Sequence, residues 1–134
     1  WIHSSLKLSQ DLIREVSARG NVKYLVSPNK LHHLFIADWI KAFPEAICYA
    51  SPGLVKKRRD ITFDKELGMH PEAEWSTEIN QTIFKGSPAL QEVVFSHSRS
   101  KTLILADLIE YFKPDSFNWW QRILARVKHR LIGD

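Results

Sequence analysis

The sequence has little of what several protein classes require. Its single cysteine, Cys48, excludes an intramolecular disulfide framework and any zinc site of the CxxC type. Five glycines and six prolines exclude a collagen-like chain, and a hydrophobic content of 44% excludes a disordered one. No uncharged apolar run approaches the ~18 residues that cross a bilayer, so we expect no membrane partner. The lone cysteine and the lack of a charged-then-apolar signal segment favour a cytoplasmic location.

The chain has the length of one domain. Its 134 residues can enclose a core, because a chain of this size buries ~65–70% of its unfolded surface. It begins with Trp1 rather than Met, and we expect a segment to be missing at one or both ends. The net charge is +4, and two basic clusters contribute to it: 56–59, and Arg122, Arg126, Lys128 and Arg130. We expect solvated charge rather than a nucleic-acid partner, because neither a nucleic-acid motif nor interleaved aromatic residues accompany them.

The first half of the sequence alternates strand and helix patterns. The predicted elements are a strand end at 1–3, a helix between an N-cap at Ser9 and a stop at Gly20, a strand at 22–26, a buried helix opening at His32 and ending at 43–44, and a strand at 46–50. This alternation predicts parallel strand pairs with right-handed crossovers. Residues 60–76 are weakly periodic and are predicted to be mostly loop.

The second half predicts a meander followed by a helix. Strands are predicted at 78–84, 92–95 and 102–106, so the sheet should be mixed. Apolar residues from Phe117 to Leu131 follow at helical spacing. This stripe predicts a helix that packs on the sheet, or a face through which the chain docks a missing segment or forms an oligomer.

The common catalytic motifs are absent: GxGxxG, GxxxxGK, HExxH and GxSxG. Two SxxK matches begin at Ser27 and Ser98, but four-residue matches of this kind arise by chance. Pro28 also disfavours a regular helical turn that starts at Ser27.

The informative places are two strand ends, because ligands of such sheets bind beyond the carboxyl ends of strands. One strand leads into His32 and His33, and another stops at Asp107. If the two strands are neighbours, either histidine could share a metal with Asp107, and His97 is a further candidate ligand. These ligand types suit zinc, iron or manganese. Structural roles remain open, since a histidine there can cap or pack and Asp107 can cap the next turn.

Four segments carry a family resemblance: 1–4, 27–35, 51–54 and 92–107. They resemble an uncharacterised, mainly bacterial domain family that is thought to be a divergent relative of the metallo-β-lactamase-like hydrolases. The likeness covers most of residues 1–112, and its most specific parts are the Pro-Asn-x-x-His-His-Leu-Phe stretch and the strand that stops at Asp107. The resemblance implies an α/β fold, a mixed-sheet αββα sandwich that is incomplete at one or both ends, since that fold is usually nearer ~200 residues.

The resemblance also implies a degenerate metal site. In the superfamily pattern HxHxDH, His33 takes the last place and His32 the Asp place, whereas Lys30 and Pro28 stand where the leading histidines belong. Asp107 takes the place of the bridging aspartate. One hypothesis is a metal-dependent hydrolase-like protein for an unknown small molecule, with the metal ligands drawn from His33, Asp107, His32 and His97, and with Asn29 and Lys30 as binding residues. The alternative is a metal-free, non-catalytic relative that binds a small ligand or a partner protein through a hydrogen-bonded network. A less favoured alternative is a protein that binds an anion or nucleic acid through the basic clusters.

Overall fold

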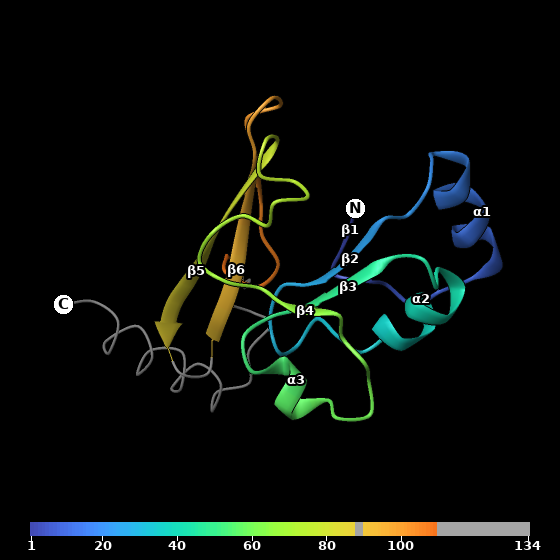
Figure 1. Cartoon of the computed structure of the whole chain (residues 1–134), viewed down its shortest axis with the longest axis horizontal. Helices are drawn as coiled ribbons and strands as arrows, with labels where there is room; N and C mark the ends of the chain where they lie inside the picture. Colours follow the sequence, from blue (N-terminus) through green and yellow to red (C-terminus); the bar gives the residue numbers. More distant parts are fainter. Residues whose placement is uncertain (88–89, 110–134) are drawn as a thin grey trace, which may run out of the picture.

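The computed structural model describes residues 1–87 and 90–109, and its first half forms a parallel sheet (Figure 1). The elements in chain order are β1 Ile2–His3, α1 Gln10–Ala18, β2 Tyr24–Ser27, α2 Ile36–Ala42, β3 Ile47–Ala50, α3 Leu54–Lys57 and β4 Lys65–Glu66. Each strand pairs in parallel with the next, in the order β1-β2-β3-β4. The predicted parallel pairing is therefore confirmed, while the short helix α3 was not predicted.

The two longer helices begin for different reasons. Ser9 caps α1 as predicted: its hydroxyl accepts a hydrogen bond from the Leu12 amide at 3.2 Å. The prediction that a helix opens at His32 is wrong, because α2 begins only at Ile36. The side-chain oxygen of Asn29 accepts the amide hydrogens of residues 31 and 32 at 2.8 and 2.9 Å, which holds this segment in a turn.

The second half forms an antiparallel meander, as predicted. It consists of β5 Ile79–Ser87, β6 Leu90–His97 and β7 Thr102–Ile104. The prediction from the strand pattern that the meander makes the sheet mixed is wrong, because these strands form a second, antiparallel sheet and the first sheet is parallel. The backbones of the two sheets pair locally: Asn29 and Glu92 form an isolated antiparallel bridge, and the Val93 amide donates to the Pro28 carbonyl at 2.8 Å.

The described elements form three layers. Figure 1 shows α1 and α2 on one side of the parallel sheet and the β5–β6 hairpin on the other. One buried cluster joins the helices to the sheet through Leu25, Ile36, Trp39 and Cys48. A second cluster joins the two sheets and contains Val26, Tyr49, Trp75, Val93 and Phe95. Only one face of α2 is buried, at Ile36 and Trp39, so the prediction of a helix buried on nearly every side is wrong.

Some predictions lie outside the described residues. The helical stripe from Phe117 to Leu131 and the basic cluster at 122–130 both do. Within the described ranges, none of the helices has the length and apolar character that a membrane span requires.

Candidate functional site

Polar side chains gather where three strands end. Ser4 follows β1, Asn29 follows β2, and Asp107 comes three residues after the last residue of β7. Because β1 and β2 are parallel, their carboxyl ends share one edge of the sheet, and the bridge between Asn29 and Glu92 brings β6 to the same edge. This is the kind of edge at which open α/β sheets bind ligands.

The structure brings together His32 and Asp107, two of the residues singled out from the sequence. The Nε2 atom of His32 lies 2.8 Å from Oδ1 of Asp107. The exposed fractions of the two side chains are 32% and 16%, so the pair borders solvent without being open to it on all sides. A carboxylate only accepts hydrogen bonds, so this geometry places the hydrogen of the ring on Nε2 and leaves Nδ1 as an acceptor.

The hydroxyl of Ser4 completes a chain of three groups. Its Oγ forms a hydrogen bond with His32 Nδ1, the acceptor nitrogen of the neutral ring. Ser4, His32 and Asp107 therefore form a continuous hydrogen-bonded series. Sequence reasoning missed Ser4, although it directly follows a predicted strand at the edge where ligands were expected.

Asn29 links this series to a buried carboxylate. Its amide nitrogen donates to Oδ2 of Asp107 at 2.9 Å and to Oε2 of Glu92 at 3.0 Å. Together with the two backbone amides that its oxygen accepts, Asn29 uses both ends of its side chain. Asn29 thus holds a central position among protein groups, and the binding role expected for it stays a prediction.

Glu92 is fully buried and fully engaged. Its exposed fraction is 0%, and its two oxygens accept the backbone amides of Ala106 and Asp107, each at 2.7 Å. β7 ends at Ile104, before the predicted end at Ala106. The amides of Ala106 and Asp107 donate to the Glu92 side chain and not to the backbone of a neighbouring strand. The sequence carried no signal for this role, because charged residues are seldom fully buried.

His33 points to a different partner from His32. It is buried, and its Nδ1 lies 2.7 Å from a guanidinium nitrogen of Arg58, which also pairs with Asp60 at 2.7 and 2.8 Å. Burial, and then the charges of Lys57 and Arg58, hold the pKa of His33 below its usual value. A neutral His33 with a cation at Nδ1 is poorly placed to share an ion with Asp107.

The other predicted residues lie apart from the pair. His97 ends β6 and its Nδ1 is 2.6 Å from Ser100 Oγ in the turn before β7. It lies five positions along β6 from Glu92, which is about 17 Å at ~3.4 Å per residue. The Lys30 side chain lies against Gly53. The backbone carbonyl of Lys30 accepts a hydrogen bond from Lys57 Nζ at 2.5 Å. Among residues 1–87 and 90–109, no three His, Cys, Asp or Glu side chains gather as metal ligands.

A further histidine lies between the two sheets beside this site. The His3 ring stacks on Trp1, with centroids 5.5 Å apart, and meets Phe95 edge-on at 5.6 Å. Burial lowers its pKa to about 4, against a smaller opposing effect of Glu92. His3 is therefore neutral at pH 7 and packs between aromatic rings.

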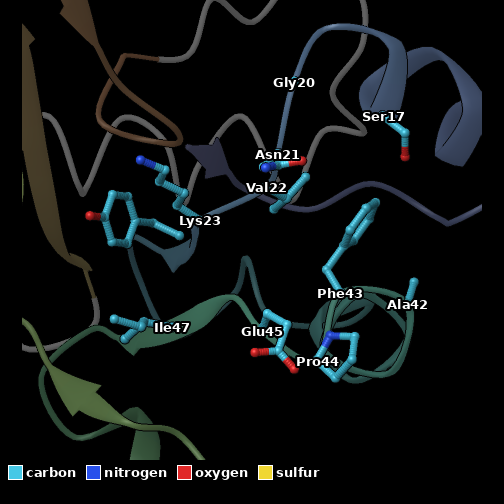
Figure 2. A pocket seen from close by; sticks show the side chains of 11 residues that line it. Ser17, Gly20, Asn21, Val22, Lys23, Ala42, Phe43, Pro44, Glu45 and Ile47 are labelled. Atoms are coloured by element: carbon cyan, nitrogen blue, oxygen red, sulfur yellow. The ribbon is translucent and has the colours of Figure 1, made fainter.

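A hollow lies at the opposite end of the parallel strands, where β2 and β3 begin. It has a volume of about 640 Å³ and is bordered by the segments before β2 and β3. Figure 2 shows Phe43, Pro44 and Glu45 on one side of it and Val22 and Lys23 on the other. β2 and β3 start at this hollow, whereas His32 and Asp107 lie beyond the carboxyl ends of the strands. The hollow is therefore separate from the Ser4–His32–Asp107 series.

Comparison of the chain with known protein families, with curated proteins and with solved structures found no match. A function for this chain therefore has to be inferred from the arrangement of its described side chains.

Proposed function

We propose that this chain is a hydrolase-like protein whose working pair is His32 and Asp107. The observation that carries the proposal is the 2.8 Å contact between His32 Nε2 and Asp107 Oδ1 at the carboxyl edge of a parallel sheet. A carboxylate in this position orients the imidazole and stabilises the imidazolium that forms when the ring accepts a proton. The fold proposed for the chain is the αββα sandwich of the metallo-β-lactamase-like hydrolases, and the order of one helical layer and two sheets in the described residues supports it.

The chemistry assigned to His32 is general base catalysis. Its Nδ1 is the free-electron-pair nitrogen of the neutral ring, and about a third of the side chain is exposed. The Ser4 hydroxyl contacts this nitrogen, so a group that loses a proton during ester or amide hydrolysis reaches His32 through that hydroxyl or by displacing it. Such proton transfer by a positioned histidine accelerates reactions by about 10²–10⁴-fold.

The metal-dependent form of the proposal uses the same pair. His32 and Asp107 offer two ligands, whereas catalytic zinc sites typically take three protein ligands. His33 and His97 face other partners, so the described residues fit a resident zinc, iron or manganese poorly. Elemental analysis after expression with these metals tests this form: about one ion per chain, lost in both His32→Gln and Asp107→Asn, would support it, and a substoichiometric content would contradict it.

Hydrolysis of p-nitrophenyl acetate tests the proposal without a known substrate. We expect turnover above the rate of free imidazole, with at least a tenfold loss in His32→Gln and in Asp107→Asn. His70→Gln is the matched control, because His70 is an exposed loop histidine. Equal rates in wild type, both site variants and the control would contradict a hydrolytic role for the pair.

A second candidate function rests on a separate observation. Each oxygen of Glu92 and Asp107 already accepts a hydrogen bond from this chain. Such a satisfied network is expected of a non-catalytic relative that binds a small ligand or a partner protein. The ester assay decides between the two, since only the hydrolase-like form predicts a rate that depends on His32. A cytoplasmic location stays a prediction.

A further inference from the structure

Ser4 has an unusual backbone for a residue with a side chain. Its φ is +57°, one of two positive values among the non-glycine residues described. The Ser4 amide still donates to the Val26 carbonyl at 3.0 Å, so the chain bends away directly after its last contact with β2. A side chain in the left-handed region costs free energy, and such strain concentrates at functional sites.

The same combination positions nucleophiles in other hydrolases. In the nucleophile elbow, a serine sits on a strained turn directly after a strand, which presents its hydroxyl at the edge of the sheet. Ser4 has the strand end, the positive φ and a half-buried side chain. It differs in sequence context, since no GxSxG motif surrounds it and the following helix begins only at Gln10.

The hydrogen-bonded partners of Ser4 supply what a nucleophilic serine needs. A hydroxyl is a weak nucleophile until a base within hydrogen-bond reach takes its proton, and that base must itself be oriented by a third group. His32 contacts Ser4 through one ring nitrogen and Asp107 through the other. Asn29 in turn fixes the second oxygen of Asp107 at 2.9 Å.

We infer that Ser4 is the nucleophile of a Ser4–His32–Asp107 triad that transfers acyl groups from esters to water. The inference rests on the proposed hydrolase-like function and adds a covalent step to it. The Ser4 oxygen bonds to the acyl carbon and the ester C–O bond breaks, while the serine proton passes through His32 Nδ1 to the leaving alcohol. Water then attacks the acyl carbon while His32 takes its proton. The bond between that carbon and the Ser4 oxygen breaks, the acid leaves, and His32 returns the proton to the Ser4 oxygen.

The triad is reversed relative to the usual arrangement, in which Nδ1 faces the carboxylate and Nε2 the serine. Here Nε2 faces Asp107 and Nδ1 faces Ser4. The reversal leaves the proton transfers possible, because a neutral imidazole has one donor nitrogen and one acceptor nitrogen, and either ring nitrogen can be the acceptor.

A fluorophosphonate probe tests the inference directly. Attack by Ser4 forms an oxygen–phosphorus bond and breaks the phosphorus–fluorine bond, the proton moves to His32, and fluoride leaves. Mass spectrometry of the tryptic peptide that ends at Lys7 should place the label on Ser4 rather than Ser5. We expect Ser4→Ala to abolish labelling, His32→Gln to slow it about 100-fold, and Asp107→Asn to slow it at least tenfold.

Ser100→Ala is the matched control, because Ser100 also contacts a histidine, His97, but at the far end of β6. It should label as wild type does. Ser4→Gly serves as a second loss-of-nucleophile variant, since glycine adopts a positive φ without strain. Circular dichroism of each variant checks that it is folded.

The outcomes separate the inference from the proposal on which it rests. Label on Ser5 or Ser100, or labelling that survives in folded Ser4→Ala and Ser4→Gly, overturns the role of Ser4. An unlabelled protein whose ester hydrolysis depends on His32 and Asp107 also overturns it, while the hydrolase-like function stands. Absence of both labelling and hydrolysis contradicts both.

Discussion

Exchange of Asn29 for aspartate is the sharpest test of the hydrogen-bonded network. The substitution keeps the shape of the side chain and replaces its amide nitrogen with oxygen. That nitrogen donates to two carboxylates, Glu92 at 3.0 Å and Asp107 at 2.9 Å. Hydrogen bonds to charged groups contribute about 1.5–3 kcal/mol each, so we expect Asn29→Asp to lower the free energy of unfolding by about 3–6 kcal/mol at pH 7.5.

The loss should depend on pH in a definite direction. Beside two carboxylates, the new carboxyl group has a folded-state pKa above its unfolded value of ~3.9, because a second and third negative charge oppose its ionisation. A raised folded pKa means that the folded chain binds more protons, so stability is retained near pH 4 and is lost as the pH rises. The deficit relative to wild type should therefore be smallest near pH 4 and grow towards pH 7.5.

Urea unfolding of both proteins at several pH values measures this deficit. Asn80→Asp is the control, because Asn80 is exposed and its amide donates to the Ser98 hydroxyl rather than to a carboxylate. We expect the control to change stability by less than about 0.5 kcal/mol. A deficit below about 1 kcal/mol for Asn29→Asp, or one that does not change with pH, would refute the reasoning.

Three buried groups give further predictions. Burial holds the pKa of His3 at about 4 in the folded protein, below the unfolded value of 6.5. As the pH falls from 6.5 to 4, wild type should therefore lose up to about 3 kcal/mol more free energy of unfolding than His3→Phe. Equal losses in urea titrations of the two proteins would contradict this. Burial raises the pKa of Cys48 to about 12, so Ellman's reagent should modify the native thiol at least 100-fold more slowly than the unfolded one. Trp75, 4% exposed, packs on Tyr49 and Tyr24 between the sheets, so Trp75→Ala should cost about 3–5 kcal/mol in urea unfolding and Trp75→Phe clearly less.

Local patterns predicted most of the elements because local forces determine them. The β-branched and aromatic residues of β2, and the serine cap of α1, act over a few neighbouring residues. The start of α2 was mispredicted because Asn29, several residues upstream, captures two backbone amides in a turn. Separate sheets were mispredicted as one mixed sheet because strand pairing between the two halves is a tertiary choice that periodicity does not encode.

The sequence predicted site residues only where a side chain that can bind a metal or transfer a proton directly follows a strand pattern. His32 and Asp107 both follow strand patterns, and that alone indicated a meeting of the two. His33 looked equivalent to His32, but the direction of its side chain and its pairing with Arg58 depend on α3, which was not predicted. Glu92 was missed because it sits within a strand pattern, and its partners are backbone amides fourteen and fifteen residues away.

The most direct test of the central claim is the tautomer of His32, measured by ¹⁵N NMR of the imidazole rings with assignment from His32→Gln. In the neutral form of the ring, we predict that the hydrogen is on Nε2, with Asp107→Asn changing the Nε2 resonance and Ser4→Ala changing that of Nδ1. A hydrogen on Nδ1 instead, or resonances that neither substitution changes, would contradict the Ser4–His32–Asp107 series.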